Sequence, residues 1–226
     1  MKSFPPLGAY LGTSFLDWPE RVAAVFFVQG CNFRCPFCHN GELVNGEAPE
    51  IDVDVAVADC ARRAAFLDGV VVSGGEPTIY PSLVDFIMRL KTETGLDVKL
   101  DTNGSNPGML RELLEANTLE YVAMDIKAPW NLYDLMAGVN VDVSAIGKSV
   151  RILRRLGVGY EFRTTWVPEL MTLEELAGVQ KCIDEDNNWI IQCFRPGSTL
   201  DPSLSDSLAA DPELVRERFP GVAVRG

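Results

Sequence analysis

The residues best suited to chemistry in this chain are three cysteines, Cys31, Cys35 and Cys38, which lie in one short segment with the spacing Cys-x3-Cys-x2-Cys. Thiolates this close together can bind one metal centre, either a zinc ion or an iron–sulfur cluster. Both usually take four protein ligands in structural sites, and the next cysteine, Cys60, lies far along the chain. A cluster on three cysteines leaves one iron open, and an open metal position is where a small molecule binds and reacts.

Other polar residues suited to ligand binding follow apolar segments later in the chain. Gly74 and Gly75 allow the backbone to approach a ligand closely, and Glu76 can accept hydrogen bonds from an ammonium group. Further groups of this kind are Asp101-Thr102-Asn103-Gly104, Asp125-Ile126-Lys127, Arg163-Thr164-Thr165 and Gln192. Taken without the cysteines, the same residues would indicate only an ordinary strand-to-helix turn and an ion-pair network at the rim of the fold.

The elements that must position these residues alternate along the chain. The expected strands are 22–28, 69–73, 98–101, 121–126, 160–167 and 189–194. The expected helices are 53–66, 82–94, 107–116, 143–156 and 173–185, the first of them capped by Asp52. This alternation predicts repeated βαβ units and an α/β fold with a parallel sheet, either a partial barrel or a doubly wound sheet. In both, ligands bind at the carboxyl ends of the strands, which is where the cysteines and polar groups fall.

Composition and charge limit the possible functions. The 226 residues predict one domain, 1–226, with an irregular lead-in over 1–20 and a closing segment over 196–226 that contains a short helix near 212–218. The net charge of −12 opposes general binding to nucleic acid and docking on anionic membranes. We expect neither a signal peptide nor a membrane span. Six cysteines in such a chain predict a reducing, cytoplasmic location.

The cysteine spacing, with Phe37 before the last cysteine and Ser73-Gly74-Gly75-Glu76-Pro77 further on, resembles the radical S-adenosylmethionine (SAM) superfamily. The resemblance implies a partial (βα)6 barrel with a parallel sheet, and a [4Fe-4S] cluster on Cys31, Cys35 and Cys38. SAM would bind the fourth iron through its amino and carboxylate groups. One electron from the cluster would then cleave SAM to methionine and a 5′-deoxyadenosyl radical.

Within that superfamily, the Asp-Thr-Asn-Gly and Asp-x-Lys segments resemble glycyl-radical-enzyme activating enzymes. The resemblance implies that the Gly-Gly-Glu turn binds the methionine amine of SAM and that Asp101 and Asp125 help to hold a monovalent cation. It also implies that Lys127 and Arg163 contact the SAM carboxylate, and that Phe37 lies beside the adenine. The expected cofactor-binding residues are Phe37, Gly74, Gly75, Glu76, Asp101, Thr102, Asp125, Lys127, Arg163 and Gln192.

The remaining histidine and cysteines are not expected to bind the cluster. His39 directly follows the cysteine motif and is expected to shape the loop or the adenine pocket. Cys60 and Cys182 lie on apolar helical patterns and are expected in the core. Cys193 lies on the last expected strand, and its role is left open. Because none has a nearby Cys-x2-Cys partner, we expect no second cluster.

Two further segments, Ser14-x-x-Asp17-Trp18-Pro19 and Gln192-x-Phe194-Arg195-Pro196-Gly197, resemble anaerobic ribonucleoside-triphosphate reductase activating proteins. The resemblance implies that the substrate is the reductase, in which one glycine loses an α-hydrogen and becomes a stored glycyl radical. A low-potential carrier such as flavodoxin or ferredoxin would supply the electron. Two alternatives stay open: a radical SAM enzyme acting on a small molecule or peptide, and a non-catalytic iron–sulfur or zinc-binding protein.

Overall fold

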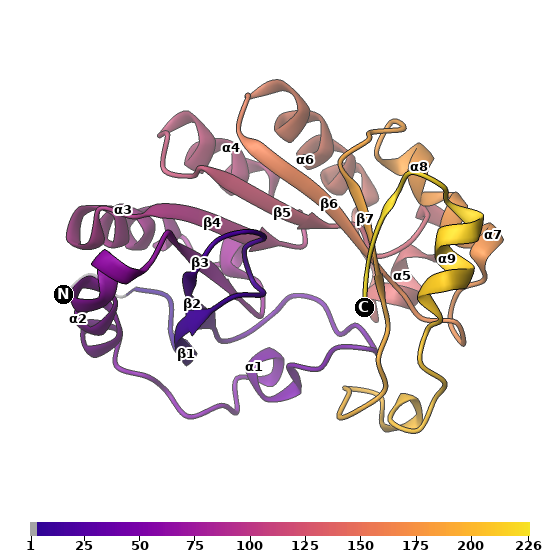
Figure 1. The fold of residues 1–226 in the computed structure, drawn as a ribbon, viewed down its shortest axis with the longest axis horizontal. Helices are drawn as coiled ribbons and strands as arrows, with labels where there is room; N and C mark the ends of the chain where they lie inside the picture. Colours follow the sequence, from indigo (N-terminus) through magenta and orange to yellow (C-terminus); the bar gives the residue numbers. More distant parts are fainter. Residues whose placement is uncertain (1–3) are drawn as a thin grey trace.

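The computed structural model describes residues 4–226, which form one eight-stranded sheet with helices along it (Figure 1). The strands are β1 (Leu7–Ser14), β2 (Ala23–Val28), β3 (Gly69–Gly74), β4 (Asp97–Thr102), β5 (Tyr121–Asp125), β6 (Gly159–Trp166), β7 (Trp189–Cys193) and β8 (Ala223–Arg225). They lie side by side in chain order, and every neighbouring pair is parallel except β1 with β2. Because β1 and β8 are the two edges of the sheet, the barrel is incomplete, as predicted.

The six predicted strands are β2 to β7, each within one residue of its expected bounds. The expectation of an irregular lead-in is wrong for Leu7–Ser14, which forms β1 and pairs antiparallel with β2. Glycines weaken the strand pattern of this segment in the sequence. A Cβ on Gly8 would lie 2.4 Å from a terminal methyl group of Leu43, so a larger residue there would require that side chain to move. Strand β8 also lies outside the predicted strands, since three residues are too short to show a period.

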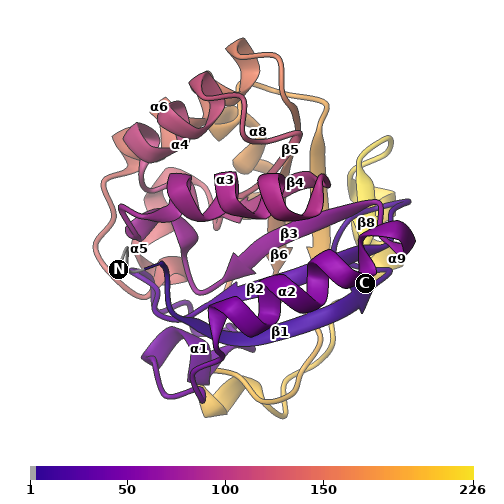
Figure 2. The ribbon, with the colours of Figure 1, turned by 90° about the vertical axis from the view of Figure 1, so that its left-hand side faces the viewer.

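Helices follow the parallel strands in the expected order. They are α1 (Gly41–Asn45), α2 (Val53–Arg63), α3 (Leu83–Thr94), α4 (Pro107–Glu115), α5 (Tyr133–Ala137), α6 (Val143–Arg155), α7 (Leu173–Ala177), α8 (Val179–Cys182) and α9 (Pro212–Arg218). Asp52 caps α2 by accepting hydrogen bonds from the N–H groups of Asp54 and Val55. The helix expected over 173–185 is instead two short helices divided at Gly178. Figure 2 shows α2 and α3 lying across one side of the sheet. No helix within residues 4–226 is long and apolar enough to cross a membrane.

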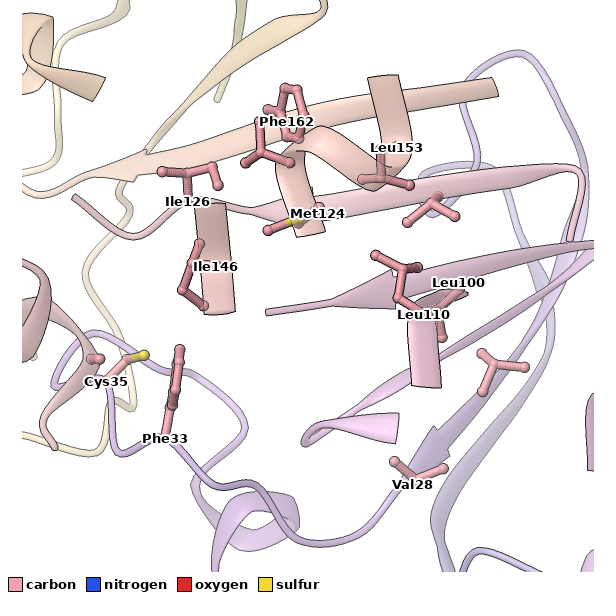
Figure 3. Packing of buried hydrophobic residues seen from close by; sticks show 14 of the residues in the cluster. Val28, Phe33, Cys35, Leu100, Leu110, Met124, Ile126, Ile146, Leu153 and Phe162 are labelled. Carbon is pink, nitrogen blue, oxygen red and sulfur yellow. The ribbon is translucent and has the colours of Figure 1, made fainter. Parts of the chain in front are cut away.

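The two faces of the sheet differ in chemistry because side chains alternate along each strand. The face beneath the helices is apolar, and Leu100, Met124 and Phe162 pack there against Leu110 of α4 and Leu153 of α6 (Figure 3). The cysteine loop reaches the same core, since Phe33 and Cys35 are buried at its margin. The helices therefore anchor both the sheet and the loop that carries the thiols.

The inner face of the sheet carries charged side chains in place of an apolar core. A small apolar cluster of Trp18, Ala23, Val25 and Val71 occupies one part of this face. Lys99 and Asp101 follow on β4, Asp125 ends β5, and Glu161 and Arg163 lie on β6. The register pairs Asp125 with Arg163 across β5 and β6. The charged residues thus face the interior of the incomplete barrel at neighbouring positions.

Candidate functional site

The cysteine loop follows β2 and is fastened at several points. Gly30 begins it with a φ of 75°, a left-handed conformation that favours glycine. The N–H of Arg34 donates to the carbonyl oxygen of Ala137 at the end of α5, at 2.8 Å. Gly138 follows there with a φ of 67°, and a Cβ on it would lie 2.0 Å from the carbonyl oxygen of Arg34. A glycine distant in sequence is therefore needed for the loop to pack.

The three thiols of Cys31, Cys35 and Cys38 line one open cavity of about 250 Å³ at the carboxyl ends of the strands. All three are free cysteines. Burial raises the pKa of Cys31 to about 12 and also raises that of Cys35. Thiols in this environment stay protonated until a metal centre supplies positive charge and binds them as thiolates.

The donor set of the cavity fits a cluster of several irons. Its three free thiols are donors of the kind that hold the irons of such a cluster. A [4Fe-4S] cluster places each thiolate on a separate iron, so its ligands spread around an object larger than one ion. The three thiols are the predicted cluster ligands, and the structure brings them to one cavity.

The Gly-Gly-Glu turn packs directly against the start of the cysteine loop. The N–H groups of Gly75 and Glu76 donate to the carbonyl oxygens of Val28 and Gly30, both at 2.9 Å. A Cβ on Gly75 would lie 1.8 Å from the Gly30 oxygen, and one on Gly74 would lie 2.3 Å from the Val28 nitrogen. Both glycines are therefore required by the contact between two protein segments. That these glycines also contact a ligand stays a prediction.

Glu76 lines the cavity, and its carboxylate ties the turn to the end of β4. One carboxylate oxygen, Oε1, accepts from the N–H and the hydroxyl of Thr78, at 3.0 and 2.5 Å, and from the hydroxyl of Thr102 at 2.7 Å. The other, Oε2, accepts from the N–H of Asn103 at 2.6 Å. Burial raises the pKa of Glu76 despite these four donors. Oε1 accepts three of these bonds and Oε2 only one, so Oε2 is the oxygen that keeps an unused acceptor position for the predicted bond to the SAM amine.

Five charged side chains form a continuous chain of ion pairs across the inner face. Lys99 Nζ lies 2.5 Å from Asp101 Oδ1, and Arg163 Nη1 lies 3.4 Å from Asp101 Oδ2. Arg163 Nε also lies 2.9 Å from Asp125 Oδ1, and Lys127 Nζ lies 2.9 Å from Asp125 Oδ2. The chain therefore runs Lys99, Asp101, Arg163, Asp125, Lys127, with three positive charges and two negative ones.

The protonation states of this chain are fixed by its own charges. Burial opposes ionisation of Asp125, but Arg163 and Lys127 outweigh it and lower the pKa of the carboxyl to about 2. The same balance, with Arg163 and Lys99, lowers the pKa of Asp101. Asp125 in turn raises the pKa of Lys127 against the effect of burial. These shifts keep Asp101, Asp125 and Lys127 ionised at neutral pH, and all three line the cavity together with Arg163. The formal charges of the five residues leave one positive charge in excess.

The remaining predicted residues divide into two groups. Phe37 and Thr102 line the cavity, and Lys127 Nζ lies 6.0 Å from the centre of the Phe37 ring. Gln192 is not part of the lining. It lies on β7 in register with Thr165 of β6, and Thr165 does line the cavity. The fold thus brings nine of the ten predicted cofactor-binding residues to one cavity and places the tenth one strand away.

His39 lies at the cavity, and the three other cysteines lie in the core. His39 also lines the cavity; its Nε2 lies 2.9 Å from the carbonyl oxygen of Arg195, and its ring stacks on Phe194. Cys60 and Cys182 are buried in the apolar core, as predicted. Cys193 is buried in the same core and is absent from the lining of the cavity.

Three positions outside the expected cofactor-binding residues also contribute to the site. Asn103 donates from Nδ2 to Oδ1 of Asn32 in the cysteine loop at 2.9 Å, so it joins the end of β4 to that loop. Ser73 donates to Asp101 at 3.1 Å. Lys99 forms an ion pair with Asp101 through its ammonium group. The signal for Lys99 was present in the sequence, because a lysine within an apolar strand, two residues before an aspartate, shares its face of the sheet.

The sequence profile of the Radical SAM superfamily matches residues 25–179 of this chain. A relative from Methanocaldococcus jannaschii, whose name places it among the glycyl-radical enzyme activating enzymes, is 33% identical over 192 residues, 83% of this chain and 79% of that protein. The pyruvate formate-lyase-activating enzyme of Clostridium pasteurianum is 33% identical over 117 residues, 50% of this chain. The chain spans about half the length of that enzyme, since the match covers 48% of it.

Two solved structures share the fold at low sequence identity. SuiB of Streptococcus suis, solved bound to the precursor peptide SuiA, has a TM-score of 0.62 at 14% identity, covering 89% of this chain and 48% of that one. Coproporphyrinogen III oxidase of Escherichia coli, a radical SAM enzyme, has a TM-score of 0.60 at 14% identity, covering 88% and 50%. The profile match over residues 25–179 shows that the chain belongs to the radical SAM superfamily. Within it, the chain is a member of the glycyl-radical-enzyme activating enzymes, which confirms the family predicted from its motifs. Membership implies a [4Fe-4S] cluster and SAM as cofactors.

Proposed function

We propose that this chain cleaves SAM reductively and uses the product to form a glycyl radical on a partner enzyme, anaerobic ribonucleoside-triphosphate reductase. The observation that supports it most strongly is one cavity lined by Cys31, Cys35 and Cys38 together with an ion-pair chain that carries one excess positive charge. When bound, the cluster supplies the electron that splits SAM into methionine and a carbon-centred radical. In the overall reaction, one glycine α-hydrogen would pass to the 5′-carbon of the nucleoside fragment of SAM, which would yield 5′-deoxyadenosine and a glycyl radical.

The residues of the chain bind and orient the reactants. Lys127 and Arg163 present the excess positive charge to the SAM carboxylate, and Phe37 contributes an apolar ring to the adenine side of the cavity. Asp101 and Asp125 hold the two cations in place, because each carboxylate is paired with protein groups on both oxygens. These contacts lie in a partly buried site, where charge-assisted hydrogen bonds are stronger than in water. In this proposal the protein binds and orients the reactants, and the cofactors carry out the bond-breaking chemistry.

The proposed partner rests on the lead-in and closing motifs, and the structure gives the first of these a role. Ser14 donates to Asp17 Oδ2 at 2.5 Å, and Trp18 packs over Gly69, where a Cβ would lie 2.6 Å from the indole. The turn places Trp18 beside Ala23 and Gly69, at the amino ends of β2 and β3. The opposite end, which holds the cysteine loop, is where we propose that a glycine-bearing loop enters. A low-potential carrier such as flavodoxin or ferredoxin is the proposed electron donor.

Anaerobic reconstitution with iron and sulfide, followed by SAM and a strong reductant, tests the first step. We expect 5′-deoxyadenosine from the native chain, none from Cys35→Ala, and native amounts from the control Cys60→Ala, whose thiol is buried away from the cavity. Adding the reductase is expected to produce a glycyl radical signal in electron paramagnetic resonance. Formation of 5′-deoxyadenosine without that signal would favour a small-molecule or peptide substrate. Failure to cleave SAM at all would refute the proposal.

A further inference from the structure

Lys99 is a fully buried lysine in the middle of the inner face of the sheet. Its side chain is 1% exposed, and its ammonium donates to Asp101 Oδ1 at 2.5 Å and to the carbonyl oxygen of Asp17 at 2.7 Å. A buried ammonium is costly unless it is paired and hydrogen-bonded, so these two contacts are the reason it is tolerated. Lys99 is thus a fixed positive charge in direct contact with a carboxylate of the cavity.

The second contact of Lys99 is built by the turn that follows β1. The N–H groups of Leu16 and Asp17 donate to the hydroxyl of Ser14, which itself donates to the Asp17 side chain. Trp18 then packs into the small apolar cluster of the inner face. The turn therefore fixes the Asp17 carbonyl oxygen next to the ammonium of Lys99. The lead-in motif thus also supplies a hydrogen-bond acceptor to this buried lysine.

The two aspartates expected to hold a monovalent cation are already satisfied by protein cations. Asp101 contacts Lys99 on one oxygen, and Ser73 and Arg163 on the other. Asp125 contacts Arg163 on one oxygen and Lys127 on the other. An added cation would enter a chain that carries three positive and two negative charges. The residues of this chain therefore do not fit a monovalent cation at Asp101 and Asp125.

We propose that the ammonium of Lys99 is a built-in cation that replaces a dissociable monovalent ion, and that Lys99 is a positioning residue of the SAM site. It acts through Asp101: by neutralising one oxygen of that carboxylate, it leaves Arg163 shared between Asp101 and Asp125 and able to present charge to the cavity. Its part in SAM binding rests on the proposed function, whereas its part as an internal cation concerns the cofactor-free chain alone.

Two substitutions separate the charge of Lys99 from its volume. Lys99→Ala removes the ammonium and leaves room for a small cation beside Asp101. Lys99→Met also removes the charge but fills the space with a side chain of similar length. Lys91→Met is the matched control, because Lys91 pairs with Glu120 and lies outside the cavity lining.

The first experiment measures the thermal midpoint of the cofactor-free 226-residue chain in ammonium, potassium and choline chloride at equal ionic strength. We expect the native chain and Lys91→Met to have the same midpoint in all three salts. Lys99→Ala is expected to have a lower midpoint in choline chloride and to recover several degrees in ammonium or potassium chloride. Lys99→Met is expected to be lower in every salt. A native midpoint that rises specifically with potassium or ammonium would overturn the inference.

The second experiment measures SAM binding to the reconstituted chain by equilibrium dialysis in the same salts. For the native chain we expect dissociation constants within about twofold of one another across the three salts. For Lys99→Ala we expect binding about tenfold weaker in choline chloride, recovered largely by ammonium, as for one lost charge-assisted contact. If the native chain binds no SAM in any salt, the proposed function fails while the midpoints still decide the role of Lys99. Native binding that requires potassium would contradict the inference and leave the proposed function standing.

Discussion

Gly75 offers a direct test of how the cavity is assembled from two protein segments. Its φ is not in the left-handed region, so the backbone there accepts an alanine. The obstacle is contact: the new Cβ would lie 1.8 Å from the carbonyl oxygen of Gly30, and real Cβ atoms essentially never approach closer than 3.0 Å. Gly75→Ala must therefore move the turn after β3 away from the cysteine loop by about 1 Å or more.

The cost of that movement follows from the bonds it breaks. The Gly75 and Glu76 N–H groups each donate across this contact at 2.9 Å, and both bonds would be lengthened beyond hydrogen-bonding range. Each buried donor left without a partner costs about 1–3 kcal/mol. The lower chain entropy of alanine in the unfolded state offsets about 0.4–1 kcal/mol. Two such donors, less that offset, lead us to expect Gly75→Ala to lower the free energy of unfolding by about 1–5 kcal/mol.

Urea unfolding of the cofactor-free chain measures this difference, with Gly108→Ala as the control. Gly108 lies in the first turn of α4, and the nearest atom to a Cβ on it is Asn106 Oδ1 at 3.5 Å. The control is expected to stabilise the chain by up to about 1 kcal/mol, the helix propensity gained. Iron retained after anaerobic reconstitution gives a second measurement, which we expect to fall only in Gly75→Ala. If Gly75→Ala unfolds within about 0.5 kcal/mol of the native chain, the packing argument is wrong.

Two further predictions concern the charge chain and the lone histidine. Asp125→Asn deprives Lys127 and Arg163 of a shared carboxylate, and because Asp125 is partly exposed we expect a loss of about 2–3 kcal/mol at pH 7, below the range for a fully buried pair. The pKa of Asp125 is lowered to about 2 in the folded chain, whereas the pKa of an aspartate in the unfolded chain is near 4. The stability difference between the native chain and Asp125→Asn should therefore have its full size above about pH 4 and shrink as the pH falls towards 2. Urea unfolding between pH 7 and pH 3 measures this difference, and a difference that stays constant would contradict the prediction. His39→Ala is expected to retain native iron, because His39 contacts the Arg195 carbonyl oxygen, whereas Cys38→Ala loses it; iron analysis and absorption spectra decide.

The sequence predicted the strands and the placement of the site because both depend on local patterns. An apolar run of five to eight residues, ended by polar residues, identifies a buried strand and its carboxyl end at once. The parallel topology then brings those ends together, so residues as distant as Cys31 and Arg163 could be assigned to one cavity. The tight spacing of the cysteines added a motif that needs no tertiary information.

What the sequence did not predict depends on contacts between distant segments. The need for glycine at Gly138 comes from the Arg34 carbonyl oxygen, which no local pattern places there. Strand β1 exists because its backbone pairs with β2, although its glycines weaken its own strand pattern. Gln192 was assigned to the site because it lies near the end of its strand. It lies on β7, one strand further along the sheet than Thr165 of β6, and is not among the residues that line the cavity.

The division of the sheet into an apolar and a charged face explains why the ion-pair chain can serve a binding site. The outer face buries enough apolar surface under the helices to support the fold, so the inner face is free to carry charges. Buried ion pairs add little net stability, because removing charges from water costs about as much as their attraction returns. Their value here is geometric: Asp101 and Asp125 fix Arg163 between two strands, and the anchor at Lys99 sets the position of the first carboxylate. A ligand carboxylate entering the cavity therefore meets charges that are already oriented, and little reorganisation is needed when it binds.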